Sequence, residues 1–290
     1  MNSIYIDAKL DESTRRDCIY NGEIFFISPT KSSLELCAFA AELSRVAFNG
    51  LDPVTAYQAM PVEKYVEILA SLKPTFIHHP ESKRLIKNIL VETGHDLQKT
   101  YFDVPRLRTA APSDYLRYGI AYAFHPHRDT WYSAPQNQIN WWMPVFEMQS
   151  GNSMAFHPYY WKNPLANSSH IYNYQNWNAT MRANAAENIK SDSRPQPQAT
   201  ETVVMEPQTR IICPVGGMIL FSGAQLHSTV PNQTSETRFS IDFRIVNEED
   251  VKLGRGAPNI DSACTGTALG DFLRGTDLEK LPQTLIEKFL

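Results

Sequence analysis

Two short segments, a hundred residues apart, constrain this chain more than any other feature. The first, FHPHRDTW, contains the pair His127 and Asp129. The second, LHSTVPNQTSETRFS, contains His227 and, eleven residues later, Arg238. Two imidazoles and one carboxylate can hold ferrous iron on one face and leave the opposite face open to oxygen and a co-substrate. The fold therefore has to bring two distant segments together.

Length, charge and cysteine usage limit the class of protein. The 290 residues can bury a large core, and a net charge of -4 gives no reason to expect nucleic acid or an anionic membrane as partner. No apolar run approaches the ~20 residues that span a bilayer, and the N-terminal segment lacks the pattern of a secretory signal. The four cysteines show no CxxC spacing. We expect a cytoplasmic protein with free thiols and a small-molecule substrate, and a homodimer is left open.

The first third of the chain is predicted to be mainly helical. Residues 32–48 carry apolar side chains at helical spacing and end near an Asn-Gly pair, which favours a helix C-terminus. A second helix is predicted to begin at Pro61. A third follows Pro80 and closes at Gly94, since proline suits the first turn of a helix.

Strands are predicted only after about residue 115, where the pattern changes. Short strands with turn signals and few helices favour a sandwich or jelly roll, and helices followed by strands favour an α+β arrangement. We expect a single domain over 1–290, with a helical part at 1–114, a jelly-roll core at 115–250 and a C-terminal extension at 251–290 that ends in a helix. The predicted strands cover 116–124, 138–148, 201–206, 216–223 and 237–246.

A polar segment at 158–207, rich in Asn, Gln, Ser and Pro, is too long for a plain connection inside a compact domain. Its six aromatic residues (Tyr159, Tyr160, Trp161, Tyr172, Tyr174 and Trp177) argue against simple disorder. We interpret it as an insert that closes over a substrate like a lid. The alternatives are a satellite core or an oligomer contact.

The metal ligands follow from strand geometry. Residues two apart in a strand point to the same face, so His127 and Asp129 can grip one ion, and His227 approaches from a neighbouring strand. His125 faces the same way and would complete the His-x-His of a cupin metal motif. The glutamate of that motif is missing, since the positions where it should fall hold Trp131 and Tyr132. We therefore favour the His-x-Asp set and assign His125 to the pocket wall or to a supporting role.

The strand TRFSIDFRIV has one apolar face and one polar face, and Arg238 and Ser240 lie on the polar face. A buried arginine needs an anionic partner. A dicarboxylate co-substrate supplies one, and the guanidinium can bind its distal carboxylate in a bidentate pair. The alternative is an internal salt bridge to Asp242 or another acid, and Arg244 is the second choice for the co-substrate role.

These residues, His127-Arg-Asp129, His227 and Arg238, resemble the iron(II)- and 2-oxoglutarate-dependent oxygenases, most closely the phytanoyl-CoA dioxygenase-like branch. GNSMAFHP at 151–158 also resembles that branch, and the likeness covers roughly residues 115–246. It implies a double-stranded β-helix in which His127, Asp129 and His227 bind Fe(II). It further implies that Arg238, with Ser240, binds the C5 carboxylate of 2-oxoglutarate, with O2 as the oxidant and succinate and carbon dioxide as co-products.

The substrate pocket is expected to mix aromatic and amide side chains. Gln138, Asn140 and Trp142 alternate along one predicted strand, and Gln138 is also assigned to the co-substrate. The pocket residues expected are Trp131, Tyr132, Asn140, Trp142 and His125. We expect hydroxylation, desaturation or dealkylation of a small polar metabolite, such as a natural-product intermediate. The alternatives are a cupin-type metal enzyme that does not use 2-oxoglutarate and a non-catalytic jelly-roll binding protein.

Overall fold

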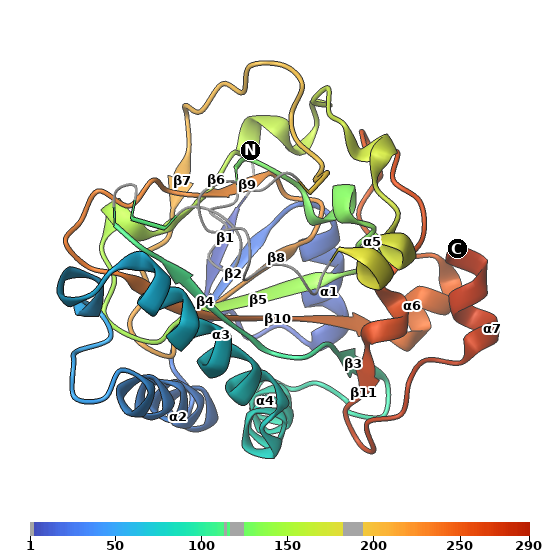
Figure 1. The fold of residues 1–290 in the computed structure, drawn as a ribbon. Helices are drawn as coiled ribbons and strands as arrows, with labels where there is room; N and C mark the ends of the chain where they lie inside the picture. The colour runs from blue at the N-terminus through green and yellow to red at the C-terminus, as the bar shows by residue number, and fades with distance from the viewer. Residues whose placement is uncertain (1–2, 113–114, 117–124, 182–193) are drawn as a thin grey trace.

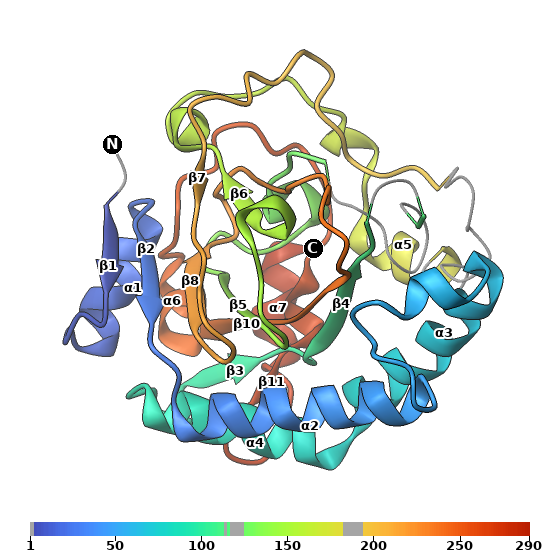
Figure 2. The same ribbon diagram turned by 90° about the vertical axis from the view of Figure 1, so that its left-hand side faces the viewer.

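Two β-sheets form the centre of the fold (Figures 1 and 2). The computed structural model describes residues 3–112, 115–116, 125–181 and 194–290. The larger sheet contains, in spatial order, β1 (Ile4–Ile6), β2 (Ile24–Ile27), β8 (Met218–Ser222), β5 (Ile139–Pro144), β10 (Arg238–Asn247), β3 (Thr100–Phe102) and β11 (Leu273–Arg274), and β10 also pairs with β4 (Arg106–Ala110). The smaller sheet contains β7 (Thr209–Arg210), β6 (Met154–Phe156) and β9 (His227–Thr229).

Three long helices lie together on one side of the larger sheet (Figures 1 and 2). They are α2 (Lys31–Ala47), α3 (Val62–His78) and α4 (Pro80–Glu92), and they agree with the predicted helices. The side chain of Thr30 accepts a hydrogen bond from the backbone of Ser33 and caps α2. Gly94, with a φ of +82°, follows α4, as expected for a glycine at a helix end.

Four shorter α-helices and seven 3-10 helices complete the secondary structure of the described residues. The α-helices are α1 (Glu12–Tyr20), α5 (Tyr174–Thr180), α6 (Glu248–Leu253) and α7 (Gln283–Ile286). The 3-10 helices are η1 (Ala56–Ala59), η3 (Asp129–Tyr132), η4 (Ser150–Asn152), η5 (Pro158–Trp161), η6 (Ser169–Ile171), η8 (Ala268–Asp271) and η9 (Glu287–Phe289).

Alternation along β10 divides the larger sheet into an apolar outer face and a polar inner face. Phe239, Ile241 and Phe243 are almost fully buried and pack in one core with residues of α2, α3 and α4. Trp141 of β5 stacks on Phe243 at 5.3 Å between ring centroids. Burial of each such side chain contributes roughly 1.5–3 kcal/mol to folding. The helices therefore cover one face of the sheet, and the other face is left for the site.

The inner face packs partly against the smaller sheet. A second apolar cluster joins Trp142, Ile219 and Phe221 of the larger sheet to Met154 and Phe156 of β6. The rings of Phe156 and Phe221 meet edge to face with centroids 4.9 Å apart. The chain is therefore a mixed α/β fold with two sheets face to face.

Several predicted elements require correction. Strands β1 to β4 lie before residue 115 and β11 lies in the C-terminal extension, so the sheet is not confined to 115–250. Residues 201–206 form no strand, and the C-terminal helix α7 has four residues. Most of the predicted strand at 116–124 lies outside the described residues. The short strand β2 pairs with β8, which is far away in sequence, and β1 joins the sheet through β2, so a local pattern does not show either strand.

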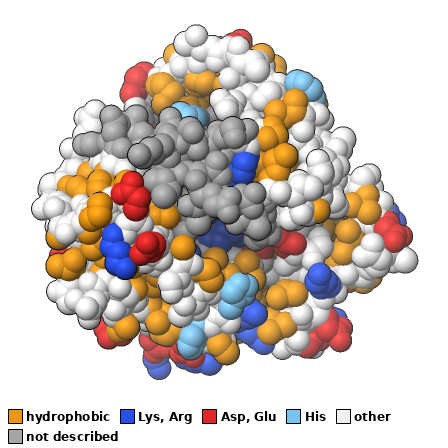
Figure 3. All heavy atoms as spheres, viewed as in Figure 1, with side chains coloured by type: hydrophobic (Ala, Val, Ile, Leu, Met, Phe, Trp, Pro, Cys, Tyr) orange, Lys and Arg blue, Asp and Glu red, His pale blue; other side chains and the backbone are white. Residues whose placement is uncertain are grey.

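The surface side chains and the cysteines point to no particular binding partner. On the face shown in Figure 3, hydrophobic, acidic and basic side chains are interspersed. Within the described ranges, no helix has the length and apolar character needed to cross a bilayer. The four cysteines are free, and Cys37 and Cys213 are buried, which agrees with the prediction of free thiols.

Candidate metal centre and cavity

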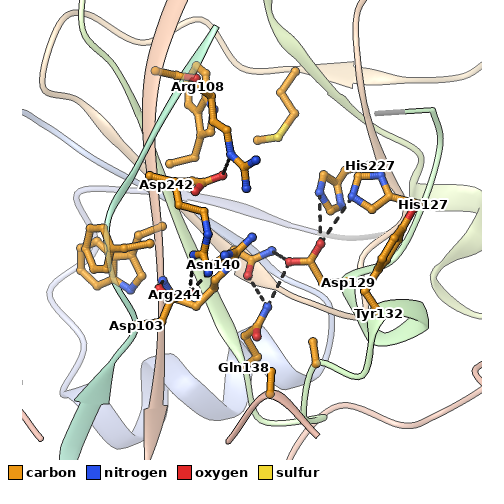
Figure 4. Close-up of a pocket in the computed structure, with 18 of the residues that line it drawn as sticks. Asp103, Arg108, His127, Asp129, Tyr132, Gln138, Asn140, His227, Asp242 and Arg244 are labelled. Atoms are coloured by element: carbon orange, nitrogen blue, oxygen red, sulfur yellow. Dashed lines mark hydrogen bonds and ion pairs between the residues drawn. The ribbon is translucent and has the colours of Figure 1, made fainter. Parts of the chain in front are cut away.

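Two backbone hydrogen bonds bring the distant segments together. The amide of His127 donates to the carbonyl of His227 at 3.0 Å, and the amide of His227 donates to the carbonyl of His127 at 3.0 Å. The two imidazole centroids lie 4.3 Å apart. Ligand atoms of His127, Asp129 and His227 all lie within 4.8 Å of one another. The structure thus assembles the three side chains that the sequence singled out (Figure 4).

Both imidazoles are oriented so that their Nε2 atoms face Asp129. His127 Nδ1 lies 2.8 Å from the carbonyl of His125, and His227 Nδ1 lies 3.0 Å from the carbonyl of Gln225. A carbonyl only accepts, so both Nδ1 atoms donate and both Nε2 lone pairs are available to a metal. The Nε2 atoms lie 3.4 Å and 3.9 Å from Asp129 Oδ1. Burial, with the neighbouring His127, lowers the pKa of His227 to about 4, which keeps it neutral near pH 7.

Asp129 is held so that only one of its oxygens faces the histidines. Its Oδ2 accepts hydrogen bonds from Gln138 Nε2 at 3.0 Å and Asn140 Nδ2 at 2.7 Å. Burial opposes ionisation, but the contacts of Asp129 with the two histidines and the charge of Arg244 hold its pKa well below its usual range. A charged carboxylate with one open oxygen, beside two imidazole nitrogens, fits a divalent transition metal.

Replacement of Asn140 by alanine tests this orientation. We expect the affinity for Ni(II) or Fe(II) to fall about 10- to 100-fold, because groups that orient a ligand have effects of that size. The measurement is a metal titration by calorimetry, with circular dichroism to confirm folding. An affinity within twofold of the wild type would show that the amide of Asn140 does not orient Asp129.

Arg128, between the two ligands in sequence, points away from them and anchors the segment. It is 1% exposed, and it donates to the carbonyl of Ala224 at 2.6 Å and to Asp261 Oδ2 at 2.9 Å. Asp261 Oδ1 also accepts from Trp131 Nε1 at 2.8 Å. The C-terminal extension therefore fixes the loop that carries Asp129.

Replacement of Asp261 by alanine is expected to lower the free energy of unfolding by about 3–5 kcal/mol, because it leaves the buried Arg128 without its counter-ion. Chemical denaturation measures the loss. Asp17→Ala removes an exposed carboxylate of α1 and serves as the matched control, with a change within about 0.5 kcal/mol. A loss below about 1 kcal/mol for Asp261→Ala would contradict the anchoring role.

The metal centre opens into a cavity of about 290 Å³. One wall is the inner face of the larger sheet, with side chains from β4, β5 and β10. Another wall comes from the predicted insert, which supplies Tyr172, Tyr174 and Trp177. Tyr132 meets His127 edge to face at 5.7 Å and Tyr172 at 5.4 Å between centroids. The insert thus lines the cavity, while its Tyr160 also joins a small core with Trp131.

Arg238 extends its charged side chain to the same cavity. Its Nη1 donates to the carbonyls of Asn152 and Ser153, both at 2.9 Å, and its guanidinium lies 5.5 Å from the ring centroid of Trp142. Within the described residues, Arg238 Nε and Ser240 Oγ are buried without a hydrogen-bond partner. Burial lowers the pKa of Arg238 to about 10, so it stays charged near pH 7.

The alternative of an internal salt bridge for Arg238 is not seen among the described residues. Asp242, the acid considered for it, pairs with Arg108 at 2.9 Å. Arg244, the second choice for the co-substrate, pairs with Asp103 at 3.1 Å. Arg238 is therefore the arginine of β10 that most needs an external anion.

Six of the predicted pocket and co-substrate residues line the cavity: Tyr132, Gln138, Asn140, Trp142, Arg238 and Ser240. Two pocket predictions are wrong. Trp131 is fully buried in a core, because the chain turns into η3 after Arg128 and strand alternation stops there. His125 is exposed and does not line the cavity, and it contributes its carbonyl to His127.

Sequence reasoning missed the anchors Arg128 and Asp261, which lie 133 residues apart. It also missed the paired acids Asp103 and Asp242 as charged residues of the cavity. Alternation along β10 was the available signal for Asp242, since it shares the polar face with Arg238. No local signal marked Asp261 or Asp103.

No family model and no curated protein matches the chain. The structure is similar to EvdO2 from Micromonospora carbonacea var. aurantiaca complexed with 2-oxoglutarate, with a TM-score of 0.47 and 15% identity over 83% of this chain and 92% of that one. It is also similar to the apo form of the non-heme monooxygenase ThoJ, with a TM-score of 0.41 and 15% identity over 91% of this chain and 89% of that one.

A third similar structure is the epimerase SnoN in complex with Fe3+, alpha-ketoglutarate and nogalamycin RO. Its TM-score is 0.41 and its identity 11%, over 81% of this chain and 85% of that one. The TM-scores are below 0.5 and the sequence identities are 15% or less. We therefore infer no activity of this chain from these similarities.

Proposed function

We propose that this chain is an Fe(II)- and 2-oxoglutarate-dependent oxygenase with a double-stranded β-helix core, as in the phytanoyl-CoA dioxygenase-like branch. The observation that carries the proposal is the convergence of His127, Asp129 and His227 in a cavity that also contains the buried Arg238, which has no ion pair among the described residues. A metal-binding protein without a co-substrate would have no use for that cation.

The donor set fits ferrous iron. Two neutral imidazoles and one carboxylate leave coordination positions open, as non-heme iron oxygenases require. With 2-oxoglutarate, such an iron activates O2 for oxidation of a substrate C–H bond, and succinate and carbon dioxide leave as co-products. His127, Asp129 and His227 would hold the metal in this role.

The other residues of the cavity would bind the co-substrate and orient the metal ligand Asp129. Arg238 would take the C5 carboxylate of 2-oxoglutarate, assisted by the hydroxyl of Ser240, because both have polar atoms buried without a partner in the described part of the chain. Gln138 and Asn140 would hold Asp129 in place through its Oδ2. Tyr132 and the aromatic residues of the insert would exclude water from the reacting bond.

The reaction we propose is hydroxylation, desaturation or dealkylation of a small polar metabolite, such as a natural-product intermediate. A cavity of about 290 Å³ with aromatic, amide and charged walls suits a small molecule. The alternative of a metal enzyme that does not use 2-oxoglutarate would leave Arg238 without an anion.

Succinate release tests the proposal. The protein is freed of metal, reconstituted with Fe(II), and supplied with 2-oxoglutarate and O2, with and without a library of small metabolites. We expect succinate only when iron, 2-oxoglutarate and oxygen are all present. Tight iron binding without any 2-oxoglutarate binding would favour the cupin-type alternative, and a protein that binds neither would favour a non-catalytic binding protein.

A further inference from the structure

We infer that Arg106 and Arg244, which share the carboxylate of Asp103, form a subsite that binds a carboxylate of the substrate. The inference rests on the proposed function, because it takes the cavity beside the metal centre as the substrate site. It adds a substrate class, a small carboxylic acid, and two residues that would select it.

The subsite lies on the inner face of the larger sheet. Arg244 is paired in register with Asn140, the residue that donates to Asp129. Arg106 is paired with Asp242 on the neighbouring strand, and both arginines line the cavity. In Figure 4, Arg244 lies beside Asp103, with Asn140 and Asp129 between them and the two histidines. A group held there would lie next to the metal centre.

The charges of the subsite do not balance. Asp103 Oδ2 accepts from Nη1 of both Arg106 and Arg244, and Asp103 Oδ1 accepts from the backbone amide of Arg244 at 2.7 Å. The side chains are 4%, 16% and 19% exposed for Asp103, Arg106 and Arg244, respectively. Asp242 also faces both arginines and is paired with Arg108 at 2.9 Å, so two carboxylates face three guanidinium groups, which stay charged in proteins. The charge of Asp129, which also acts on Arg244, would be balanced by the metal. A surplus positive charge in a largely buried site favours an anion.

Both guanidinium groups also have N–H donors beyond those used in the contacts with Asp103. Among the described residues, Arg106 donates to Asp103 and to the carbonyl of Val104, and both hydrogen bonds come from its Nη1. Arg244 likewise uses Nη1 for its side-chain contact with Asp103. The remaining donors, at Nε and Nη2, match the fork geometry that binds a carboxylate with two hydrogen bonds.

This subsite is distinct from the one proposed for 2-oxoglutarate. Arg238 and Arg244 are six residues apart on one regular strand, so their backbones are separated by roughly 20 Å. Arg238 is held at its own end by the carbonyls of Asn152 and Ser153, and Arg244 is held at the other end by Asp103. The five-carbon 2-oxoglutarate is too short to occupy both places.

A single surplus charge favours a monoanion over a phosphate. The aromatic wall of Tyr132, Tyr172 and Trp177 lines the same cavity and offers an apolar surface to the body of the substrate. Benzoate combines both properties and serves as the probe, with benzamide as its neutral counterpart and phenyl phosphate as the dianion.

The test measures binding of the three probes by calorimetry to the full chain loaded with Ni(II) and 2-oxoglutarate. We expect benzoate to bind about ten- to a hundredfold more tightly than benzamide, because hydrogen bonds to a charged group are stronger than neutral ones. Equal binding of benzoate and benzamide would overturn the subsite. Tighter binding of phenyl phosphate than of benzoate would overturn the assignment to a carboxylate.

Variants of the cluster shift the affinity in opposite directions. Arg244→Met and Arg106→Met should each weaken benzoate binding about tenfold, whereas Arg84→Met, which removes an exposed arginine of α4, should leave it unchanged. Asp103→Asn should tighten binding, because it removes the carboxylate that competes with the probe. If the arginine variants do not fold, benzoate binding to Asp103→Asn is the deciding measurement. Unchanged or weaker benzoate binding to that variant would contradict the inference.

A second arm separates this inference from the proposed function. The titrations are repeated on protein treated with EDTA and free of 2-oxoglutarate. Benzoate binding that still depends on Arg244, in a protein that binds neither iron nor 2-oxoglutarate, would refute the proposed function and leave the subsite standing. Normal 2-oxoglutarate binding, together with benzoate binding that does not change in Arg244→Met, would refute the subsite and leave the proposed function standing.

Discussion

Replacement of Asp129 by alanine is expected to abolish succinate formation that depends on Fe(II) and 2-oxoglutarate. The variant removes the single charged ligand and leaves His127 and His227 as a two-ligand site. A bound metal lowers the reaction barrier by several kcal/mol, so its loss corresponds to a rate reduction on the order of a thousandfold or more. The readout is the rate of succinate release, together with the affinity for Fe(II) measured anaerobically.

The matched control is Asp17→Ala, which removes an exposed carboxylate on α1 and should retain full activity. His127→Ala is expected to behave like Asp129→Ala, since each removes one of the three converging ligand atoms. If either ligand variant keeps near-normal succinate release, the ligand assignment is wrong.

Replacement of Arg238 by methionine is expected to weaken 2-oxoglutarate binding by roughly 30- to 5,000-fold. Loss of one partner from a buried, hydrogen-bonded charge pair costs about 2–5 kcal/mol in affinity. The measurement is the dependence of succinate formation on 2-oxoglutarate concentration, and direct titration with Ni(II) in place of iron. Fe(II) affinity should change little, because Arg238 is not among the three converging side chains.

Two further variants sharpen this prediction. Arg238→Lys keeps the charge and loses the planar fork, so it should recover only part of the affinity. Arg84→Met removes an exposed arginine and should have no effect. An unchanged 2-oxoglutarate requirement in Arg238→Met would transfer the co-substrate role to another arginine, with Arg244 as the first candidate.

The helices and the polar face of β10 could be predicted because their signals are local. Pro61 and Pro80 mark helix starts, and the alternation from Arg238 to Arg244 separates the core face from the cavity face. The convergence of the metal ligands was inferred from residue types and spacing. The structure shows this convergence through the backbone pairing of His127 with His227.

The rest of the site depends on tertiary contacts that leave no local trace. Trp131 was misplaced because a 3-10 helix follows Arg128 and turns the indole toward Asp261. Asp103 and Asp242 gain their roles from arginines on paired strands. Strands such as β1 and β2, with three and four residues, are too short for periodicity to reveal.

The central claim is that His127, Asp129 and His227 bind one ferrous ion that can accept 2-oxoglutarate. Anaerobic addition of Fe(II) and 2-oxoglutarate, followed by visible absorption, tests it most directly. The account predicts a weak charge-transfer band that requires both components, saturates at one iron per chain and is absent from His227→Ala. A wild-type protein without the band, or a His227→Ala variant that retains it, would contradict the account.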